Sequence, residues 1–220
     1  MAFPNTSVIT TFLTDENPIS AGGLLLSVNM QSVSSGGGKA VPITTGDCYI
    51  YTATDTSNGN CESYVQMRQF SDPLPGFFII ARMDSATFPF PAHYSLRLSG
   101  PNGGATAALV RRSASVDTTL VTASAISWVD FTVFGLACTD TTITGYKDGV
   151  AFIGPVNDTG GFTTAGKLGM EFLSGGVPDP QVYMFGGGAT AGSVPASTFT
   201  GAGAHERLLN RAMGRGIWRV

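Results

Sequence analysis

Charged residues are scarce in this chain. They make up 12% of its 220 residues, about half the usual share of a soluble domain. The formal net charge is -3 and the pI is near 5.2, whereas a nucleic-acid-binding domain normally carries a basic face. Local basic clusters occur only at Arg111-Arg112 and in the C-terminal tail. The sequence therefore predicts no nucleic-acid partner. A surface rich in Ser, Thr and Gly instead favours a protein that packs against neighbours on the outside of a particle.

Long hydrophobic runs are also missing. No apolar stretch approaches the roughly 20 residues that a membrane-spanning helix requires. The first twelve residues, MAFPNTSVITTF, lack the basic segment and apolar core of a secretory signal. We therefore expect no membrane association and synthesis in a cytoplasm without export by the usual route.

Cysteine and histidine are rare, which limits redox and metal chemistry. Only His93 and His205 are present, so a histidine-rich metal site is excluded. The three cysteines are an odd number in a chain without a signal, which favours reduced, packed thiols. A disulfide between Cys48 and Cys61 is the alternative, because a turn separates the strands that carry them. Cys138 ends an apolar strand and is predicted to be a small core residue.

Catalytic signatures are absent from the sequence. A retaining glycanase on a β-sandwich needs paired carboxylates, but Glu171 is alone on its predicted strand and Glu62 is isolated. His205-Glu206 begins like a zinc-protease motif, but Leu209 replaces the second histidine. No nucleophile elbow or phosphate-binding loop is present. The sequence thus predicts a protein that is not an enzyme, with no catalytic residue and no cofactor.

Short β-branched and aromatic runs recur between turn residues, and helical periodicity is almost absent. These patterns predict an all-β antiparallel sandwich that forms a single domain over residues 1–220. A Gly/Ala-rich segment covers 186–203, and the tail at 204–220 has the spacing of a short helix or turn. The predicted strands are Ser7–Phe12, Leu24–Met30, Asp47–Thr54, Ser63–Gln69, Phe77–Met83, Tyr94–Leu98, Ala107–Arg112, Thr118–Val121, Trp128–Leu136, Thr142–Tyr146, Val150–Ile153, Leu168–Phe172 and Val182–Phe185.

The segment Ser127–Phe172 is the most informative part of the chain. Its Asp148-Gly149 pair supplies the positive φ angles of a two-residue hairpin turn. The order of Trp128, the strands around it and this turn resembles the core of laminin-G-like and concanavalin-A-like jelly rolls. Pro18-Ile19-Ser20-Ala21-Gly22-Gly23 resembles the opening motif of such sandwich proteins from tailed bacteriophages, and Tyr94-Ser95-Leu96-Arg97-Leu98 resembles one of their strands. The resemblance implies a two-sheet jelly roll.

The same resemblance implies a bacteriophage virion component, most simply a capsid decoration protein. Its partners would be the major capsid protein or other virion proteins. It would form a homo-oligomer such as a trimer and would be located in the virion. The tail residues Arg215, Ile217 and Trp218 would then make assembly contacts. This is a structural role without catalysis.

The alternative is a carbohydrate-binding module or adhesin that recognises a host glycan. Sugar sites combine aromatic and polar side chains, and Phe88, Phe90, His93 and Tyr94 are the best candidates in the sequence. Laminin-G-like domains often hold Ca²⁺, so a calcium ion near turn aspartates is a further alternative to a metal-free protein. The candidate ligands are Asp140, Asp148, Asp158 and Asp179.

Overall fold

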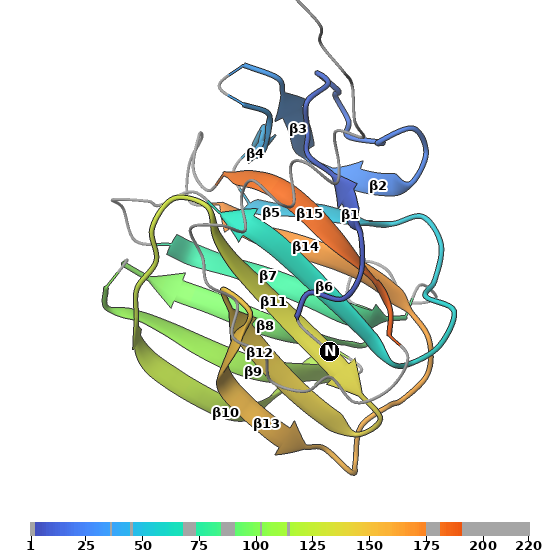
Figure 1. The fold of residues 1–220 in the computed structure, drawn as a ribbon, viewed down its shortest axis with the longest axis vertical. Helices are drawn as coiled ribbons and strands as arrows, with labels where there is room; N and C mark the ends of the chain where they lie inside the picture. Colours follow the sequence, from blue (N-terminus) through green and yellow to red (C-terminus); the bar gives the residue numbers. More distant parts are fainter. Residues whose placement is uncertain are drawn as a thin grey trace, which may run out of the picture.

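The computed structural model shows two antiparallel sheets packed face to face (Figure 1). It describes residues 3–35, 37–44, 46–67, 74–84, 91–101, 103–113, 115–174 and 181–190. The strands are β1 (Val8–Thr10), β2 (Leu25–Val28), β3 (Met30–Val33), β4 (Lys39–Pro42), β5 (Gly46–Thr52), β6 (Cys61–Met67), β7 (Leu74–Met83), β8 (His93–Gly100), β9 (Ala105–Ser113), β10 (Val116–Ile126), β11 (Thr132–Thr139), β12 (Thr142–Lys147), β13 (Val150–Asn157), β14 (Lys167–Ser174) and β15 (Val182–Ala189). The predicted all-β sandwich is confirmed, whereas the predicted C-terminal helix or turn lies outside the described residues.

One sheet has seven strands in the order β10-β9-β8-β7-β14-β5-β2. The other has eight, with β13-β12-β11-β6-β15-β4-β3 in sequence and β1 paired to β15. In Figure 1 the eight-stranded sheet lies in front of the seven-stranded one. No helix among the described residues is long and apolar enough to cross a membrane.

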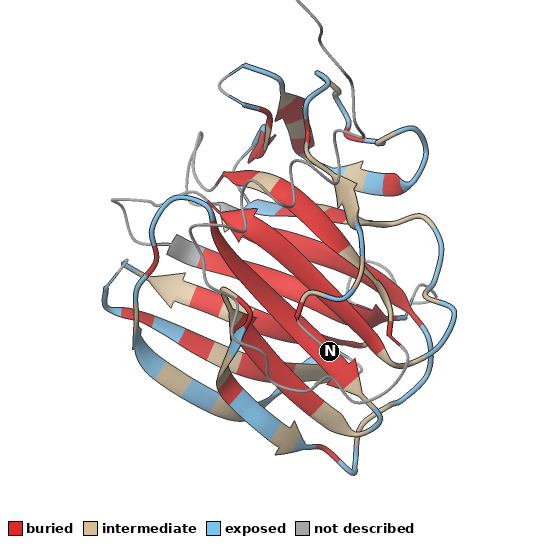
Figure 2. Ribbon diagram, in the orientation of Figure 1, coloured by how far each residue is buried: buried red, intermediate tan, exposed pale blue. Residues whose placement is uncertain are grey.

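The core lies between the two sheets, where alternate residues of each strand point inward. It includes Phe77 and Phe172 from one sheet and Phe134 and Phe185 from the other, all of them fully buried. Figure 2 shows the buried residues concentrated on the central strands of both layers. Trp128 also lies in this core, as predicted, although it precedes β11 instead of forming part of a strand.

The N-terminal segment covers the outer face of the eight-stranded sheet. Phe3 is fully buried and stacks on the ring of Tyr146, with the ring centroids 4.2 Å apart. Gly135 makes room for it, because a Cβ at that position would lie 2.1 Å from Cζ of Phe3. The buried Glu62 fixes the same segment, since its Oε1 accepts hydrogen bonds from the backbone N–H groups of Asn5 and Thr6 at 2.5 and 2.7 Å.

The start of the Gly/Ala-rich segment corrects the sequence interpretation. Residues 186–189 were expected to form a loop, but they continue β15, which pairs with β6 along its length. Glycine is required there because a Cβ at Gly186 would lie 2.3 Å from Cζ of Tyr64. Small residues in this strand thus make room for an aromatic side chain on the neighbouring strand.

Strand β10 forms one edge of the seven-stranded sheet and pairs only with β9 along the strand order. Most of its residues are exposed or half-buried. Its pairing is continuous from Val116 to Thr119 and then shifts register twice, between Thr119 and Val121 and between Ala123 and Ile126. These shifts are β-bulges or related irregularities, which bend an edge strand and interrupt its ladder.

Candidate functional site

Polar side chains gather on the outer face of the seven-stranded sheet, which is the face turned away from the other sheet. The pairing register aligns Tyr49, Glu171, Phe78 and Arg97 in one row across β5, β14, β7 and β8. Directly paired residues project to the same face of a sheet. Phe78 belongs to an apolar cluster separate from the core, together with Ile80 and Met83. This face therefore combines aromatic, aliphatic and charged groups.

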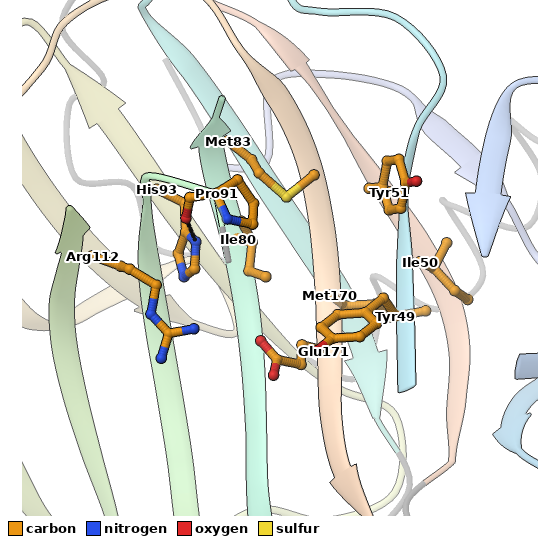
Figure 3. A pocket seen from close by; sticks show the side chains of 10 residues that line it. All are labelled: Tyr49, Ile50, Tyr51, Ile80, Met83, Pro91, His93, Arg112, Met170 and Glu171. Atoms are coloured by element: carbon orange, nitrogen blue, oxygen red, sulfur yellow. Dashed lines mark hydrogen bonds between the residues drawn. The ribbon is translucent and has the colours of Figure 1, made fainter. Parts of the chain in front are cut away.

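A pocket opens on this face, drawn in Figure 3. The pocket is shallow: its cavity volume is about 10 Å³, and the value rises to about 330 Å³ only when the adjoining space open to solvent is counted. In Figure 3 the His93 ring, the Arg112 guanidinium and the Glu171 carboxyl group converge on one part of the pocket. The described residues that line it are Tyr49, Ile50, Tyr51, Ile80, Met83, Pro91, His93, Arg112, Met170 and Glu171.

His93 presents an unpaired hydrogen-bond acceptor to this pocket. Its Nδ1 lies 2.9 Å from the carbonyl oxygen of Pro91. A carbonyl only accepts, so Nδ1 must carry the proton, and in neutral imidazole Nε2 is then the acceptor. Nε2 is buried and has no hydrogen-bond partner among the described residues. Burial lowers the pKa of His93 to about 4, against an opposing hydrogen bond from Pro91. The ring is therefore neutral near pH 7.

The carboxyl group of Glu171 can gain or lose its proton near neutral pH. It is 5% exposed, and burial, reinforced by the nearby charge of Asp47, raises its pKa to about 7. Near neutral pH the protonated form donates a hydrogen bond and the ionised form accepts them. The pocket thus offers both hydrogen-bonding modes within one side chain.

Two arginines border the pocket and share one carboxylate. Arg112 Nε lies 2.7 Å from Asp117 Oδ1, and Arg97 Nη1 lies 2.6 Å from Asp117 Oδ2. Burial alone would raise the pKa of Asp117, but the hydrogen bonds from Arg97 and Arg112 outweigh it and hold that pKa well below its usual range. The guanidinium of Arg97 also lies over the ring of Phe78, 4.6 Å from its centroid. Asp117 therefore fixes the orientation of both cations.

The protonation of Glu171 makes the stability of the fold depend on pH. Because the pKa is higher in the folded state, stability falls as pH rises from about 4.5 to about 7. We expect Glu171→Gln to raise the melting temperature at pH 8 and to leave it nearly unchanged at pH 4.5. The gain at pH 8 is at most about 3 kcal/mol, the equivalent of the pKa shift.

Thermal melts of both proteins at the two pH values test this, with Glu16→Gln as the matched control. Hydrogen bonds from the backbone N–H groups of Ser20 and Ala21 lower the pKa of Glu16, so its replacement should reduce stability at pH 8. A loss of stability at pH 8 in Glu171→Gln would contradict a buried, partly protonated carboxyl group.

The four predicted sugar-binding residues do not form one cluster. His93 lines the pocket, but Tyr94 points to the opposite face of β8, where it is 1% exposed and its hydroxyl donates to Asp158 at 2.9 Å. Phe88 and Phe90 lie outside the described residues, as do the predicted assembly residues Arg215, Ile217 and Trp218. Sequence reasoning missed Tyr49 and Arg112 as pocket residues. The signal for them is strand register, which brings β5, β14, β8 and β9 together.

The alternative of a disulfide between Cys48 and Cys61 is wrong, because all three cysteines are free and buried. Cys48 lies on β5 of the seven-stranded sheet, whereas Cys61 lies on β6 of the other. The turn between these strands crosses from one sheet to the other instead of closing a hairpin. Cys61 faces Cys138 across the β6–β11 pair instead.

The turn aspartates that the structure describes do not gather into one calcium site. Asp158 is occupied by Arg111, whose Nη1 lies 2.6 and 2.8 Å from its two carboxylate oxygens. Oδ1 of Asp148 accepts the backbone N–H of Val133 at 2.9 Å. Asp179 lies outside the described residues. The described part of the chain holds no group of three or more His, Cys, Asp or Glu side chains that fits a metal ion.

Among the described residues that line the pocket, Glu171 is the one carboxylate. Both mechanisms of glycoside hydrolysis by carboxylates need a pair of them. The pocket as described therefore has groups for binding a polar ligand but not the pair required for that hydrolysis.

Neither family models nor curated protein sequences match this chain. Solved structures do match its fold. The Ca²⁺/Man2-bound exoplasmic/lumenal domain of VIP36 has a TM-score of 0.58 at 10% identity, covering 86% of this chain and 90% of that one. The carbohydrate-binding module CBM66 from Bacillus subtilis has a TM-score of 0.52 at 11% identity, covering 73% and 91%. A Bacillus licheniformis β-glucanase has a TM-score of 0.53 at 10% identity, covering 76% and 93%.

These similarities establish the architecture. The fold is a concanavalin-A-like jelly roll, which it shares with the VIP36 domain, CBM66 and the β-glucanase. A fold of this kind hosts several activities, so the function must be argued from the pocket itself.

Proposed function

We propose that this protein is a carbohydrate-binding protein that holds a glycan in the pocket of Figure 3 without cleaving it. The observation that carries the proposal is the buried, unpaired Nε2 of His93, next to Glu171 and Arg112 in the same lining. Buried polar atoms are normally hydrogen-bonded, so an orphan of this kind calls for a partner from outside the protein. The sugar-binding domains that share the fold support the same choice.

The chemistry of the lining fits sugar hydroxyl groups. Nε2 of His93 accepts a hydrogen bond and therefore needs a donor, which a hydroxyl provides and a bare carboxylate or sulfate does not. The guanidinium of Arg112 only donates, and a hydroxyl also accepts. A pair of adjacent hydroxyls on a neutral sugar could donate to Nε2 of His93 and accept from Arg112, which also binds Asp117. Tyr49, Ile80 and Met83 supply apolar surface for the C–H groups of the ring.

The proposal is tested by screening the protein on a glycan array and measuring the best neutral glycan by calorimetry. We expect His93→Asn to weaken binding at least tenfold. Asparagine retains an N–H that can reach Pro91 but removes the acceptor at Nε2, and a lost hydrogen bond that leaves a ligand hydroxyl unpaired costs about 1–3 kcal/mol. Val150→Asn on β13 is the control, because Val150 is exposed on the other sheet.

Two results would overturn the proposal. The first is a folded protein that binds no glycan on the array, and the second is unchanged affinity in His93→Asn. Preference for uronates or sulfated sugars over neutral ones would retain the pocket but contradict the assigned roles of His93 and Arg112.

The role of capsid decoration protein stays a prediction, together with the trimer, the capsid partner and the virion location. Its predicted contact residues Arg215, Ile217 and Trp218 lie outside the described residues. The structural similarities support the carbohydrate-binding alternative better, since the three proteins named above act on or bind carbohydrates. The two roles are compatible if the glycan lies on a host surface.

A further inference from the structure

Two cysteine thiols face each other in the core, far from the glycan pocket. Cys61 on β6 and Cys138 on β11 are direct cross-strand partners. Both are fully buried and belong to the cluster between the sheets. Directly opposed residues of an antiparallel pair have Cα atoms about 4.5 or 5.5 Å apart, and both values fall within the range that a disulfide spans.

A buried arginine lies beside this pair without a carboxylate partner. Arg82 is 2% exposed, and its Nε and Nη1 donate to the carbonyl oxygens of Gly59 and Phe162 at 2.5 and 3.0 Å. Its Nη2 has no hydrogen-bond partner among the described residues. Among the described residues, no salt bridge joins Arg82 to an acid, and the Asp158 carboxylate pairs with Arg111.

A buried cation is costly unless an opposite charge compensates it. The guanidinium of Arg82 interacts electrostatically with both Cys61 and Cys138. A hydrogen bond from Cys138, helped by Arg82, lowers the pKa of Cys61 against the effect of burial. Burial raises the pKa of Cys138. The two thiols therefore differ: the pKa of Cys61 is lowered, whereas that of Cys138 is raised.

We propose that Cys61 and Cys138 form a reversible redox site in which a hydroperoxide converts the two thiols into a cross-strand disulfide, with Arg82 stabilising the attacking Cys61 thiolate. In the first step Cys61 loses its proton, its sulfur attacks one oxygen of hydrogen peroxide, and the O–O bond breaks. A sulfenic acid and hydroxide form, and the hydroxide takes up the proton that Cys61 released. In the second step the Cys138 sulfur attacks the sulfenic sulfur, the S–O bond breaks, and water leaves with the Cys138 proton. The peroxide gains the two electrons that the thiols lose.

Cys48 provides an internal reference for this chemistry. It lies on the other sheet, has no cysteine opposite it, and its thiol contacts the carbonyl oxygens of Thr44 and Gly46, both at 3.6 Å. Burial raises the pKa of Cys48. We therefore expect Cys48 to remain a thiol while the other two cysteines react.

The test is intact-mass spectrometry of the reduced protein during exposure to hydrogen peroxide, which reaches buried thiols through local opening of the structure. We expect a loss of two hydrogens, one remaining thiol after denaturation, a peptide that links Cys61 to Cys138, and full reversal by dithiothreitol. Cys48→Ala should behave like the wild type. Cys61→Ala and Cys138→Ala should form no internal disulfide.

Arg82 is tested as a positioning residue by the rate of the reaction. Arg82→Met should slow disulfide formation at least tenfold at pH 7, and Arg82→Lys should retain most of the rate, because it keeps the charge. Mass measurements on the wild type do not depend on whether the variants fold. A wild-type protein that keeps three free thiols, or that links Cys48, would overturn the proposal.

Discussion

Phe3→Ala is expected to destabilise the fold by about 3–5 kcal/mol, the usual cost of removing a buried phenylalanine ring. Phe3 is 0% exposed and stacks on Tyr146 with an interplanar angle of 6°. Its ring also meets the edge of Tyr64 at a centroid distance of 6.2 Å. Truncation would leave a cavity beside Gly135, which has no side chain to fill it. Denaturant unfolding of the two proteins measures the difference.

Phe131→Ala is the matched control for this prediction. Phe131 is 43% exposed and contacts Tyr183, so we expect its removal to cost about 1 kcal/mol or less, as for most surface substitutions. Equal losses in the two variants would show that the N-terminal segment does not hold the outer face of the eight-stranded sheet as described.

Asp158→Ala is the second substitution with a large expected effect, a loss of about 3 kcal/mol. Asp158 accepts two hydrogen bonds from Arg111 and one from Tyr94. Its side chain is 9% exposed and that of Arg111 20%. Removing the carboxylate leaves a poorly solvated guanidinium without its counter-charge and a buried tyrosine hydroxyl without its acceptor. Thermal and denaturant unfolding at pH 7 measure the loss.

Asp55→Ala is the control that shows how much stability is lost when an exposed ion pair is removed. Asp55 is half exposed and lies 3.6 Å from Lys167 Nζ. Exposed pairs contribute about 0–1 kcal/mol, so this variant should melt close to the wild type. An equally small loss of stability in Asp158→Ala would show that the Asp158 carboxylate does not stabilise the contact of β8 and β9 with the loop after β13.

Much of the fold follows from local sequence. The runs around Phe77, Leu96 and Ile143 are rich in β-branched and aromatic residues, and each forms a strand where it was predicted. The Asp148-Gly149 turn is confirmed as well, with φ angles of 49° and 81° at its two residues. Strands β3 and β4 were missed, because four-residue strands that flank Ser34–Gly38 carry too short a pattern to separate them from a loop.

The pocket was harder to predict, because residues far apart in the chain form it. Tyr49, His93, Arg112 and Glu171 lie on four different strands. The side chains of a strand alternate between the two faces of the sheet. A prediction that is wrong by one residue therefore assigns pocket residues to the core and core residues to the pocket. His93 and Tyr94 illustrate this: the sequence placed both in one site, but they lie on opposite faces of β8. Glu171 is the only carboxylate on its predicted strand, and its neighbours on adjacent strands, Tyr49 and Phe78, follow only from the pairing register.

The irregular pairing of β10 has a consequence for how copies of this protein meet in solution. An exposed edge strand offers a template on which another chain can add its own strand. A second chain that aligned along β10 would find the ladder regular only from Val116 to Thr119 before the first register shift. So short a run limits the backbone hydrogen bonds that an intruding strand can gain. The bulged edge therefore acts as a built-in barrier to fibre growth at high local concentration.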